Sequence, residues 1–259
     1  MREDGFRAEI LWKHGDAPWR NPAVRCGMLN PDDAVINPVE LLRHLASQLD
    51  RAPIEHAEVA GVDRTGSGVV VRTAEVEVRA ARMLVCLNGF VGRLFPEIAH
   101  WARPNRGQML AVRAPASEVG VSFAYYANHG YDYFRRVDAE TVIVGGRRNR
   151  FEPHERTDSD ATTDEVQRSL EACAEEMLGR AFAVTARWAG TMGFSPTGLP
   201  IVAPMPRVDG TGADPRAVFC GGFTGHGMSL GYETARHAVE VAVEGAASMM
   251  PAPPALPDV

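Results

Sequence analysis

The residues best suited to chemistry lie between Ala217 and Gly231, in the stretch AVFCGGFTGHGMSLG. Its apolar start, Ala217–Cys220, predicts a buried strand, and a helix is predicted from about Met228 to Gly245. The glycines between them let backbone pass where a Cβ atom would collide, against another element or a flat ligand. Such a turn presents free N–H groups at a helix N-terminus, where the dipole favours negative charge. The stretch can therefore hold a phosphate, an oxyanion or the anionic edge of a reduced flavin, although a plain strand-to-helix turn fits the composition equally well.

Two known motifs can be compared with this stretch. The spacing Gly225-x-Gly227-x-x-Leu230 misses the dinucleotide-binding fingerprint by one residue, and no βαβ unit fits after it. The segment Gly227–Gly231 matches the G-x-S-x-G nucleophile elbow, with Ser229 as the nucleophile. A hydrolase would then need an acid and a histidine later in the chain. His237 falls in the same predicted helix, and Asp258 lies in a proline-rich tail, so we do not favour a serine hydrolase.

The order of several segments is more specific. Gly221–Met228 resembles the C-terminal flavin-contacting segment of the D-amino-acid oxidase-like FAD-dependent oxidoreductases, which include glycine, sarcosine and γ-glutamylputrescine oxidases. Other segments resemble that family in the expected order: Asn37-Pro38, Leu84–Gly89, Arg106–Leu110, Tyr131–Arg135 with Gly145–Arg147, and Trp188–Gly190 with Gly198–Pro200. Each segment alone is weak evidence for the resemblance, but together the segments cover the chain from about Gly27 to Gly245.

The resemblance implies a set of FAD-binding residues. It places Val59 near the adenine, and the turn at Asn88 and Gly89 near the pyrophosphate. The remaining implied cofactor contacts all come from the glycine-rich turn: Gly222, Gly225, His226, Gly227 and Met228. His226 has a structural or electrostatic role in such turns, so no catalytic base is assigned. A cysteine for covalent attachment is not found near Gly190, so we expect the FAD to be bound non-covalently.

The expected reaction is oxidation of a C–N bond by hydride transfer to flavin. It requires a positive dipole near the ring edge that becomes negative, an apolar wall and groups that orient the substrate. We expect Tyr131, Tyr133 and Arg135 to form the substrate face, because residues two apart point to one side of a strand. A carboxylate of an amino-acid substrate would bind Arg135 or Arg147. The arginine that glycine oxidase-like proteins carry after Trp-x-Gly is missing here, and so is the lysine of sarcosine oxidase-like proteins, whose position is Ser229.

The strand–GxGxxG–helix unit that carries the FAD pyrophosphate in this family is found nowhere in the sequence. The favoured hypothesis is therefore the C-terminal portion of a flavin amine oxidoreductase, truncated at its N-terminus. The alternative is a non-catalytic remnant that survives as a binding or interaction domain. A truncated chain should retain little FAD and should associate, because the strand Ala81–Leu87 would lack its sheet neighbours.

Composition limits the partners. The 259 residues carry a formal net charge of −6 and show no basic stripe, which argues against nucleic acid. No apolar run approaches the roughly twenty residues of a membrane span, and the N-terminus lacks the apolar core of a secretory signal. The four cysteines form no C-x-x-C pair, so neither a metal site nor a disulfide framework is expected. We expect a cytoplasmic protein whose partner is a small amine or amino acid.

The predicted fold combines α/β and α+β parts. Residues 27–105 and 195–247 would form the partial FAD-binding domain, and residues 106–194 a mostly antiparallel substrate domain. Residues 1–26 would be a loop-rich entry with at most one short strand, and 248–259 a disordered tail. The helix Pro38–Leu49 should bury Leu41, Leu42, Leu45 and Leu49. The other predicted elements are helix Asp164–Leu178 with a Thr162–Glu165 capping box, and strands Ile54–Val62, Gly68–Thr73, Glu75–Val78, Gly107–Val112, Val121–Tyr126, Tyr131–Arg136, Thr141–Gly145, Ala183–Phe194 and Pro200–Ala203.

Overall fold

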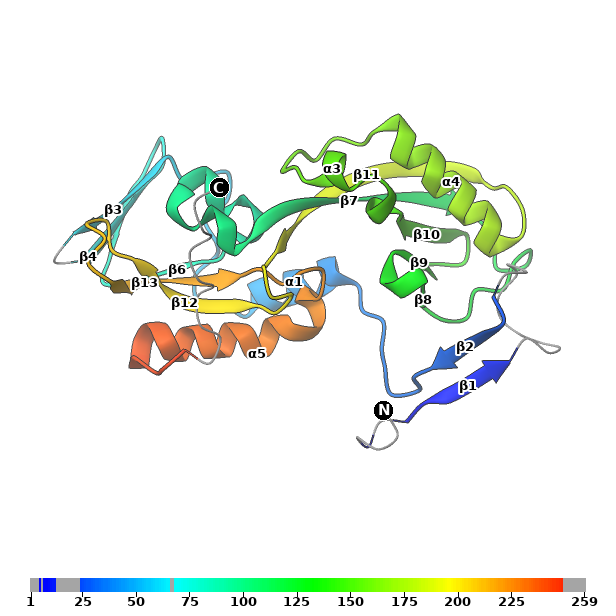
Figure 1. Cartoon of the computed structure of the whole chain (residues 1–259), viewed down its shortest axis with the longest axis horizontal. Coiled ribbons are helices and arrows are strands. Elements are labelled where there is room, and N and C mark those ends of the chain that lie inside the picture. The colour runs from blue at the N-terminus through cyan, green and yellow to red at the C-terminus, as the bar shows by residue number, and fades with distance from the viewer. Residues whose placement is uncertain (1–4, 6, 13–23, 66–67, 249–259) are drawn as a thin grey trace. The chain divides into compact units, whose positions relative to one another are not determined.

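The structure is a computed structural model that describes residues 5, 7–12, 24–65 and 68–248. The chain divides into two compact units (Figure 1). The first contains residues 1–37, 107–155 and 160–190, and the second contains residues 38–106, 156–159 and 191–259. The predicted tail lies almost wholly outside the described residues.

A five-stranded sheet dominates the first unit, with the strand order β11-β7-β10-β9-β8. Its strands are β7 (Arg103–Arg113), β8 (Tyr125–Ala127), β9 (Asp132–Arg136), β10 (Thr141–Gly146) and β11 (Ala183–Phe194). The pairs β7–β10, β10–β9 and β9–β8 are antiparallel, and short turns join β8 to β9 and β9 to β10, as predicted. A separate ribbon of β1 (Glu9–Trp12) and β2 (Cys26–Leu29) occurs where the sequence predicts at most one strand.

Helix α4 (Asp164–Leu178) lies across one face of this sheet, with the predicted bounds (Figure 1). Its buried residues Val166, Leu170 and Cys173 pack with Leu110 and Val142 of the sheet. Gly179 ends the helix in the left-handed conformation, with φ at 83°. The predicted capping box is absent. Thr163 is the N-cap residue, and its N–H and hydroxyl bind the buried amide of Gln108 instead.

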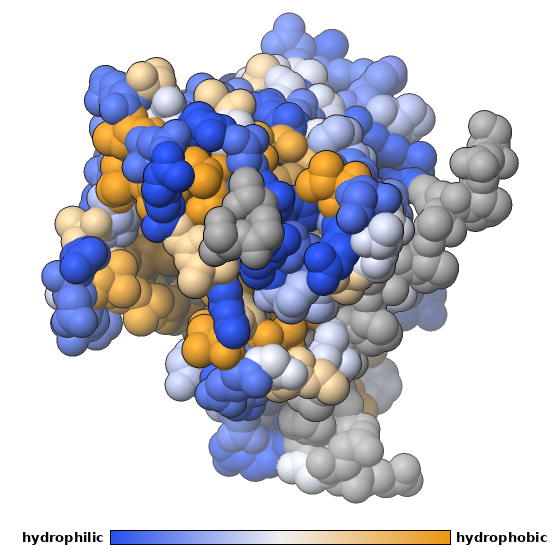
Figure 2. Space-filling view, turned by 90° about the vertical axis from the view of Figure 1, so that its left-hand side faces the viewer, coloured by the Kyte–Doolittle hydropathy of each residue, from blue (hydrophilic) through white to orange (hydrophobic). Residues whose placement is uncertain are grey.

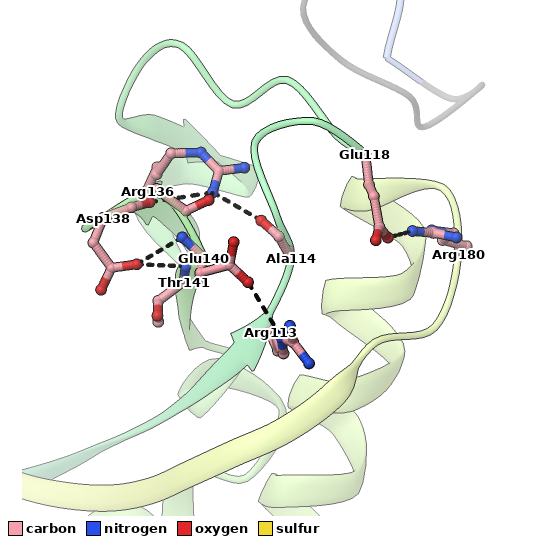
Figure 3. A network of polar contacts seen from close by, with 9 residues as sticks. Arg113, Ala114, Glu118, Arg136, Asp138, Glu140, Thr141 and Arg180 are labelled. Atoms are coloured by element: carbon pink, nitrogen blue, oxygen red, sulfur yellow. Dashed lines mark hydrogen bonds and ion pairs between the residues drawn. The ribbon is translucent and has the colours of Figure 1, made fainter.

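The β9–β10 hairpin is held by polar side chains at its turn (Figure 3). The carboxylate of Asp138 accepts the backbone N–H groups of Glu140 and Thr141 at 2.8 and 2.7 Å. Arg136 donates to the carbonyls of Ala114 and Val119, each at 2.8 Å. This side chain binds the segment that precedes β8, and β8 begins at Tyr125 and not at the predicted Val121.

The second unit is built around a three-stranded sheet with the order β12-β13-β6. Strands β12 (Ile201–Pro206) and β13 (Ala213–Gly221) are antiparallel, whereas β13 and β6 (Met83–Val85) are parallel. Helix α5 (Gly227–Val239), extended by a π-helical turn at Glu240–Glu244, packs on Val202 and Val218. The opposite face, with Phe219, is covered by residues 91–102, whose buried apolar side chains are Val91, Phe95, Ile98, Trp101 and Ala102. These residues include α2 (Val91–Leu94) and the 3-10 segment Pro96–Trp101. The shorter helical segments elsewhere in the chain are Asn88–Phe90, Asn128–Gly130, Arg148–Arg150 and α3 (Glu152–Glu155).

The predicted helix and three-stranded meander precede β6. Helix α1 spans Pro38–Ser47, and β3 (Gly61–Thr65), β4 (Gly68–Arg72) and β5 (Glu77–Ala80) form an antiparallel sheet. The strand predicted from Ile54 begins only at Gly61, and the backbone before it is left-handed at His56, where φ is 55°. Figure 2 views the molecule from the β3–β4 end, where apolar residues (orange) reach the surface between hydrophilic ones.

The predicted buried stripe of α1 is wrong. None of its residues is buried, and Leu42, Leu45 and the following Leu49 are 62%, 52% and 57% exposed. The heptad-like spacing of leucines is that of a helix with one covered face. In the described chain nothing covers that face.

Candidate functional site

The glycine-rich turn, Gly221–Gly227, is fixed at its first residues by Asn88. The side-chain oxygen of Asn88 accepts the N–H of Gly222 at 2.9 Å, across 134 positions of sequence. Asn88 itself is left-handed, with φ at 47°, and Gly222 has φ at 73°. The turn that follows β6 and the turn that follows β13 are therefore held together by a side chain at the ends of two parallel neighbouring strands.

The end of β11 approaches the same place through backbone. A Cβ atom on Gly193 would lie 2.3 Å from Oδ1 of Asn88, and one on Gly89 would lie 2.7 Å from the carbonyl oxygen of Met192. Any side chain at either glycine would displace backbone or the Asn88 amide. Glycine at both positions lets two segments meet with no side chain between them.

Thr224 completes the closure of the turn. Its N–H donates to the carbonyl of Gly193 at 2.9 Å, and its hydroxyl accepts the N–H of Ser195 at 3.2 Å. Thr224 and Gly225 both have positive φ, at 51° and 86°. These two residues thereby turn the chain before α5 begins at Gly227.

Helix α5 begins at Gly227 without a side-chain cap from its N-cap residue, His226. The ring Nδ1 of His226 contacts the carbonyl oxygen of Thr224 at 3.0 Å, which uses this nitrogen to hold the turn. The hydroxyl of Ser229 donates to the carbonyl of His226 at 3.1 Å. The first helical N–H groups, those of Gly227 and Met228, face the helix end where the dipole is positive.

The geometry around Ser229 does not assemble a hydrolase triad. Its hydroxyl is bound to the backbone of its own turn, and no histidine of the described residues bonds to it. His237 is buried further along α5, where its ring contacts Glu240 at 3.5 Å. A nucleophile elbow requires an adjacent general base.

A second group of the predicted residues lies on the open face of the five-stranded sheet, opposite α4. Tyr133 lies flat across Gly145, where a Cβ atom would come within 2.4 Å of the tyrosine ring. Tyr126 pairs with Tyr133 across β8 and β9, and their rings stack at 5.7 Å. Burial raises the pKa of Tyr133, and the neighbouring Tyr126 hydroxyl adds to this rise. The two rings form an aromatic wall.

Two arginines near this sheet, Arg135 and Arg147, differ in what they bind. Arg135 faces the same side as Tyr133, and in the described part of the chain no hydrogen bond or ion pair to it is found. Arg147 is buried, with its guanidinium 3.0 Å from Asp132 and 2.7 Å from Glu176. Arg147 is therefore paired within the fold, which distinguishes it from Arg135.

The remaining predicted residues are more scattered. Tyr131 precedes β9, and the guanidinium of Arg148 covers its ring at 4.8 Å, so it does not share the strand periodicity of Tyr133. Val59 lies in the irregular segment before β3 and is partly buried. The sequence analysis did not predict Tyr126 as a site residue. The hairpin turn Asn128–Gly130 could have indicated this residue, since that turn pairs Tyr126 with Tyr133.

A cavity of about 510 Å³ lies beside β8, between that strand and the β1–β2 ribbon. Its lining is mainly apolar and aromatic, including Leu11, Met28, Met177 and the stacked rings of Tyr125 and Phe134, whose centroids are 4.4 Å apart. Tyr126 borders this cavity as well as the open sheet face. The cavity suits an apolar group.

The described residues contain neither a metal site nor a membrane-spanning helix. No group of three or more potential ligands could hold a metal ion. Among the helices that the structure describes, none has the length and apolar character needed to cross a membrane.

Comparisons with known proteins show the family of the chain. The chain is 32% identical over 162 residues to glycine oxidase of Pseudomonas aeruginosa. The aligned region covers 60% of this chain and 42% of that protein. Among solved structures, glycine oxidase from Geobacillus kaustophilus superposes with a TM-score of 0.76 at 18% identity. L-proline dehydrogenase from P. horikoshii superposes with a TM-score of 0.69 at 13% identity.

The two structural matches cover 96% and 95% of this chain but only 66% and 67% of the other chains. The chain therefore spans less than half of the curated relative, and about two thirds of the solved structures. The family model described as FAD dependent oxidoreductase (DAO) matches residues 1–241, which is most of the sequence. The glycine-rich turn, the mixed sheet beneath it and the antiparallel sheet have their expected order, and the chain belongs to this family of FAD-dependent oxidoreductases.

Proposed function

We propose that this chain is the C-terminal portion of an FAD-dependent oxidoreductase that oxidises the C–N bond of an amine or amino acid. The observation that carries the proposal is the glycine-rich turn, which is hydrogen-bonded to the side chain of Asn88 and leads into α5. No side chain of the N-cap residue binds the first N–H groups of α5, so they can bind a ligand. The relatives that support this function are named as oxidases or dehydrogenases of glycine and proline.

The residues present fit one end of FAD. Gly222, Gly225 and Gly227 offer backbone without side chains, and the start of α5 offers a positive dipole to the ring edge that becomes negative on reduction. The pyrophosphate end requires a strand–GxGxxG–helix unit, which is absent from the sequence. The chain thus supplies the ring-facing contacts, and a further segment must supply the phosphate contacts.

When bound, flavin accepts a hydride equivalent from the carbon beside the substrate nitrogen. The chain's own residues prepare the substrate for this step. Arg135 binds and orients a carboxylate, and the Tyr126–Tyr133 wall excludes water from one side of the substrate. Because the pKa of Tyr133 is raised, its hydroxyl stays protonated and can donate a hydrogen bond.

Two exposed features of the second unit support the proposal that a further segment belongs to this protein. The leucines of α1 form an exposed apolar stripe, and β6 stands at the end of the order β12-β13-β6, with no described strand on its other edge. An apolar helix face and an unpaired strand edge are both costly to leave in water. We infer that a parallel strand and its helix, from the segment that carries GxGxxG, cover both.

The alternative is a non-catalytic remnant of the family, and flavin content separates the two. The chain should purify without a stoichiometric visible flavin band, since the phosphate contacts are missing. The DNA upstream of Met1, translated in three frames, should encode a strand, G-x-G-x-x-G and a helix, with an acidic residue about twenty positions on.

Co-expression of that upstream segment with this chain should give a yellow protein that bleaches when an amine or amino acid is added without oxygen. An unrelated upstream gene, or a joined protein that binds FAD but is bleached by no amine, would favour the remnant. We also infer non-covalent FAD and a reducing, cytoplasmic setting, which release of the flavin on denaturation and cell fractionation would test.

A further inference from the structure

Two cysteines face each other across the parallel strands of the second unit. The register of β6 and β13 pairs Ala217 with Met83, and Phe219 with Val85. One further step places Cys220 opposite Cys86. Residues in register on neighbouring strands point to the same face and are about 4.8 Å apart at Cα. This spacing lies within the range that a disulfide spans, about 4.4–6.8 Å.

The two thiols have different surroundings. Cys86 is exposed, whereas Cys220 is 6% exposed and packs beneath α5 with Val202 and Val218. The thiol of Cys220 is hydrogen-bonded to Cys86, which lowers the pKa of Cys86 to about 7. The same contact, together with burial, raises the pKa of Cys220. Cys86 therefore carries the thiolate, and Cys220 keeps its proton and donates it in the hydrogen bond.

The other two cysteines lack this arrangement. Cys26 is exposed on β2 in the first unit, and Cys173 is a buried residue of α4 beside Arg147, where desolvation raises its pKa. Reactive thiols are those that combine exposure with a stabilised thiolate. Among the described cysteines only Cys86 combines the two.

We propose that Cys86 and Cys220 are a redox-active pair, in which Cys86 is oxidised by hydroperoxides and Cys220 then closes a cross-strand disulfide. The Cys86 thiolate attacks the terminal peroxide oxygen, the O–O bond breaks, and water or an alcohol leaves. Cys220 then attacks the sulfur of the Cys86 sulfenic acid, so that an S–S bond forms, the S–O bond breaks and water leaves. Overall, two thiols give two electrons and two protons to one peroxide.

The position of the pair connects it to the candidate site. Cys86 lies two residues before Asn88, and Cys220 lies two residues before Gly222, so both flank the bond that fixes the glycine-rich turn. A disulfide there joins the ends of β6 and β13 covalently. The inference concerns the thiols alone and does not depend on bound flavin.

The test is peptide mapping of the intact chain after hydrogen peroxide treatment. Free thiols are blocked with iodoacetamide, and trypsin is used without reductant. Cys86 and Cys220 fall in the peptides 83–93 and 217–236. We expect these two peptides to appear cross-linked, and the cross-link to disappear on reduction. Oxidation of Cys86 to sulfinic acid without a link to Cys220, or a link from Cys86 to Cys26, would overturn the proposal.

Variants made on a Cys26→Ala background separate the two roles. Cys220→Ala should accumulate a sulfenic acid at Cys86 that dimedone traps, whereas Cys86→Ala should leave the buried Cys220 unmodified. Alkylation of Cys86 should be half-maximal near pH 7 and should move toward the ordinary value of about 8.5 in Cys220→Ala. An alkylation profile that Cys220→Ala leaves unchanged would contradict the paired arrangement, and the unmutated chain tests the cross-link independently of how the variants fold.

Discussion

The side-chain oxygen of Asn88 accepts the backbone N–H of Gly222 at 2.9 Å, so that two turns 134 positions apart are joined by one hydrogen bond. Asn88 follows β6 and Gly222 follows β13, and these two strands are parallel neighbours in the sheet. Asparagine suits position 88 for two reasons: it tolerates the left-handed backbone, and its side-chain oxygen accepts the Gly222 N–H.

Replacing Asn88 by alanine should therefore destabilise the chain. The Gly222 N–H would lose its acceptor, and alanine would have to adopt φ near 47°. A lost acceptor for a buried donor costs about 1–3 kcal/mol. Urea unfolding of the chain measures the change, and Asn149→Ala, at an exposed position, is the control. Equal midpoints for both variants would mean that the Asn88 bond does not hold the turn.

The glycines of the turn should separate into two kinds. Gly225→Ala should lower stability because φ is 86°, whereas Gly227→Ala should fold normally, since a Cβ there meets only Phe223, at 3.7 Å. In the completed enzyme both should weaken FAD binding, because each adds a side chain toward the ring. Flavin fluorescence titration measures this, with Gly231→Ala as the control, whose Cβ would meet open space. Wild-type affinity in both variants would remove the turn from the flavin site.

The two adjacent arginines of β9 should give opposite results. Arg135→Leu should leave stability unchanged but raise KM in the completed enzyme for amino-acid substrates about tenfold or more, which corresponds to loss of a charged hydrogen bond. Arg136→Leu should lower stability, since Arg136 binds the carbonyls of Ala114 and Val119. An amine without a carboxylate serves as the control substrate. An equal KM increase for it would contradict carboxylate binding by Arg135.

Asp138 should make the hairpin turn sensitive to acid. Hydrogen bonding from the N–H of Glu140, reinforced by Thr141, lowers its pKa. A lowered pKa in the folded state stabilises the protein above the unfolded value of about 3.9, and this contribution is lost as the pH falls through the folded pKa. Asp138→Ala should therefore be less stable than wild type at pH 7, with the difference shrinking in acid. A difference in unfolding midpoint that stays constant from pH 7 to pH 3 would contradict the ionic part of this contact.

The exposed leucines of α1 should govern association of the isolated chain. The double change Leu42→Glu and Leu45→Glu should shift the chain from aggregates toward monomer, because the charges interrupt an apolar face. Light scattering after size-exclusion chromatography measures the shift. Leu199→Glu, at a residue that is also 62% exposed but lies elsewhere, is the matched control. If the control disperses the chain equally well, the α1 face is not the associating surface.

Much of this protein was determined by local sequence pattern. The bounds of helix α4 follow from its periodicity, because a 3.6-residue repeat of apolar side chains reflects one covered face. The left-handed end of α4 at Gly179 follows from glycine alone. Family membership, too, was predicted from local segments in a fixed order, and the family model matches residues 1–241.

The tertiary structure decided which residues meet. Arg135, Arg136 and Arg147 are the same residue type within thirteen positions, yet one faces the open sheet, one closes a hairpin and one is buried against Asp132. Sequence pattern could not separate them, because the partners of an arginine are set by strands and helices remote in the chain. The same holds for the Asn88–Gly222 bond and the Cys86–Cys220 pair, which exist only because β6 and β13 are neighbours. For α1, the sequence pattern alone was misleading. The periodicity of its leucines predicted a covered face, but no described part of the chain covers it.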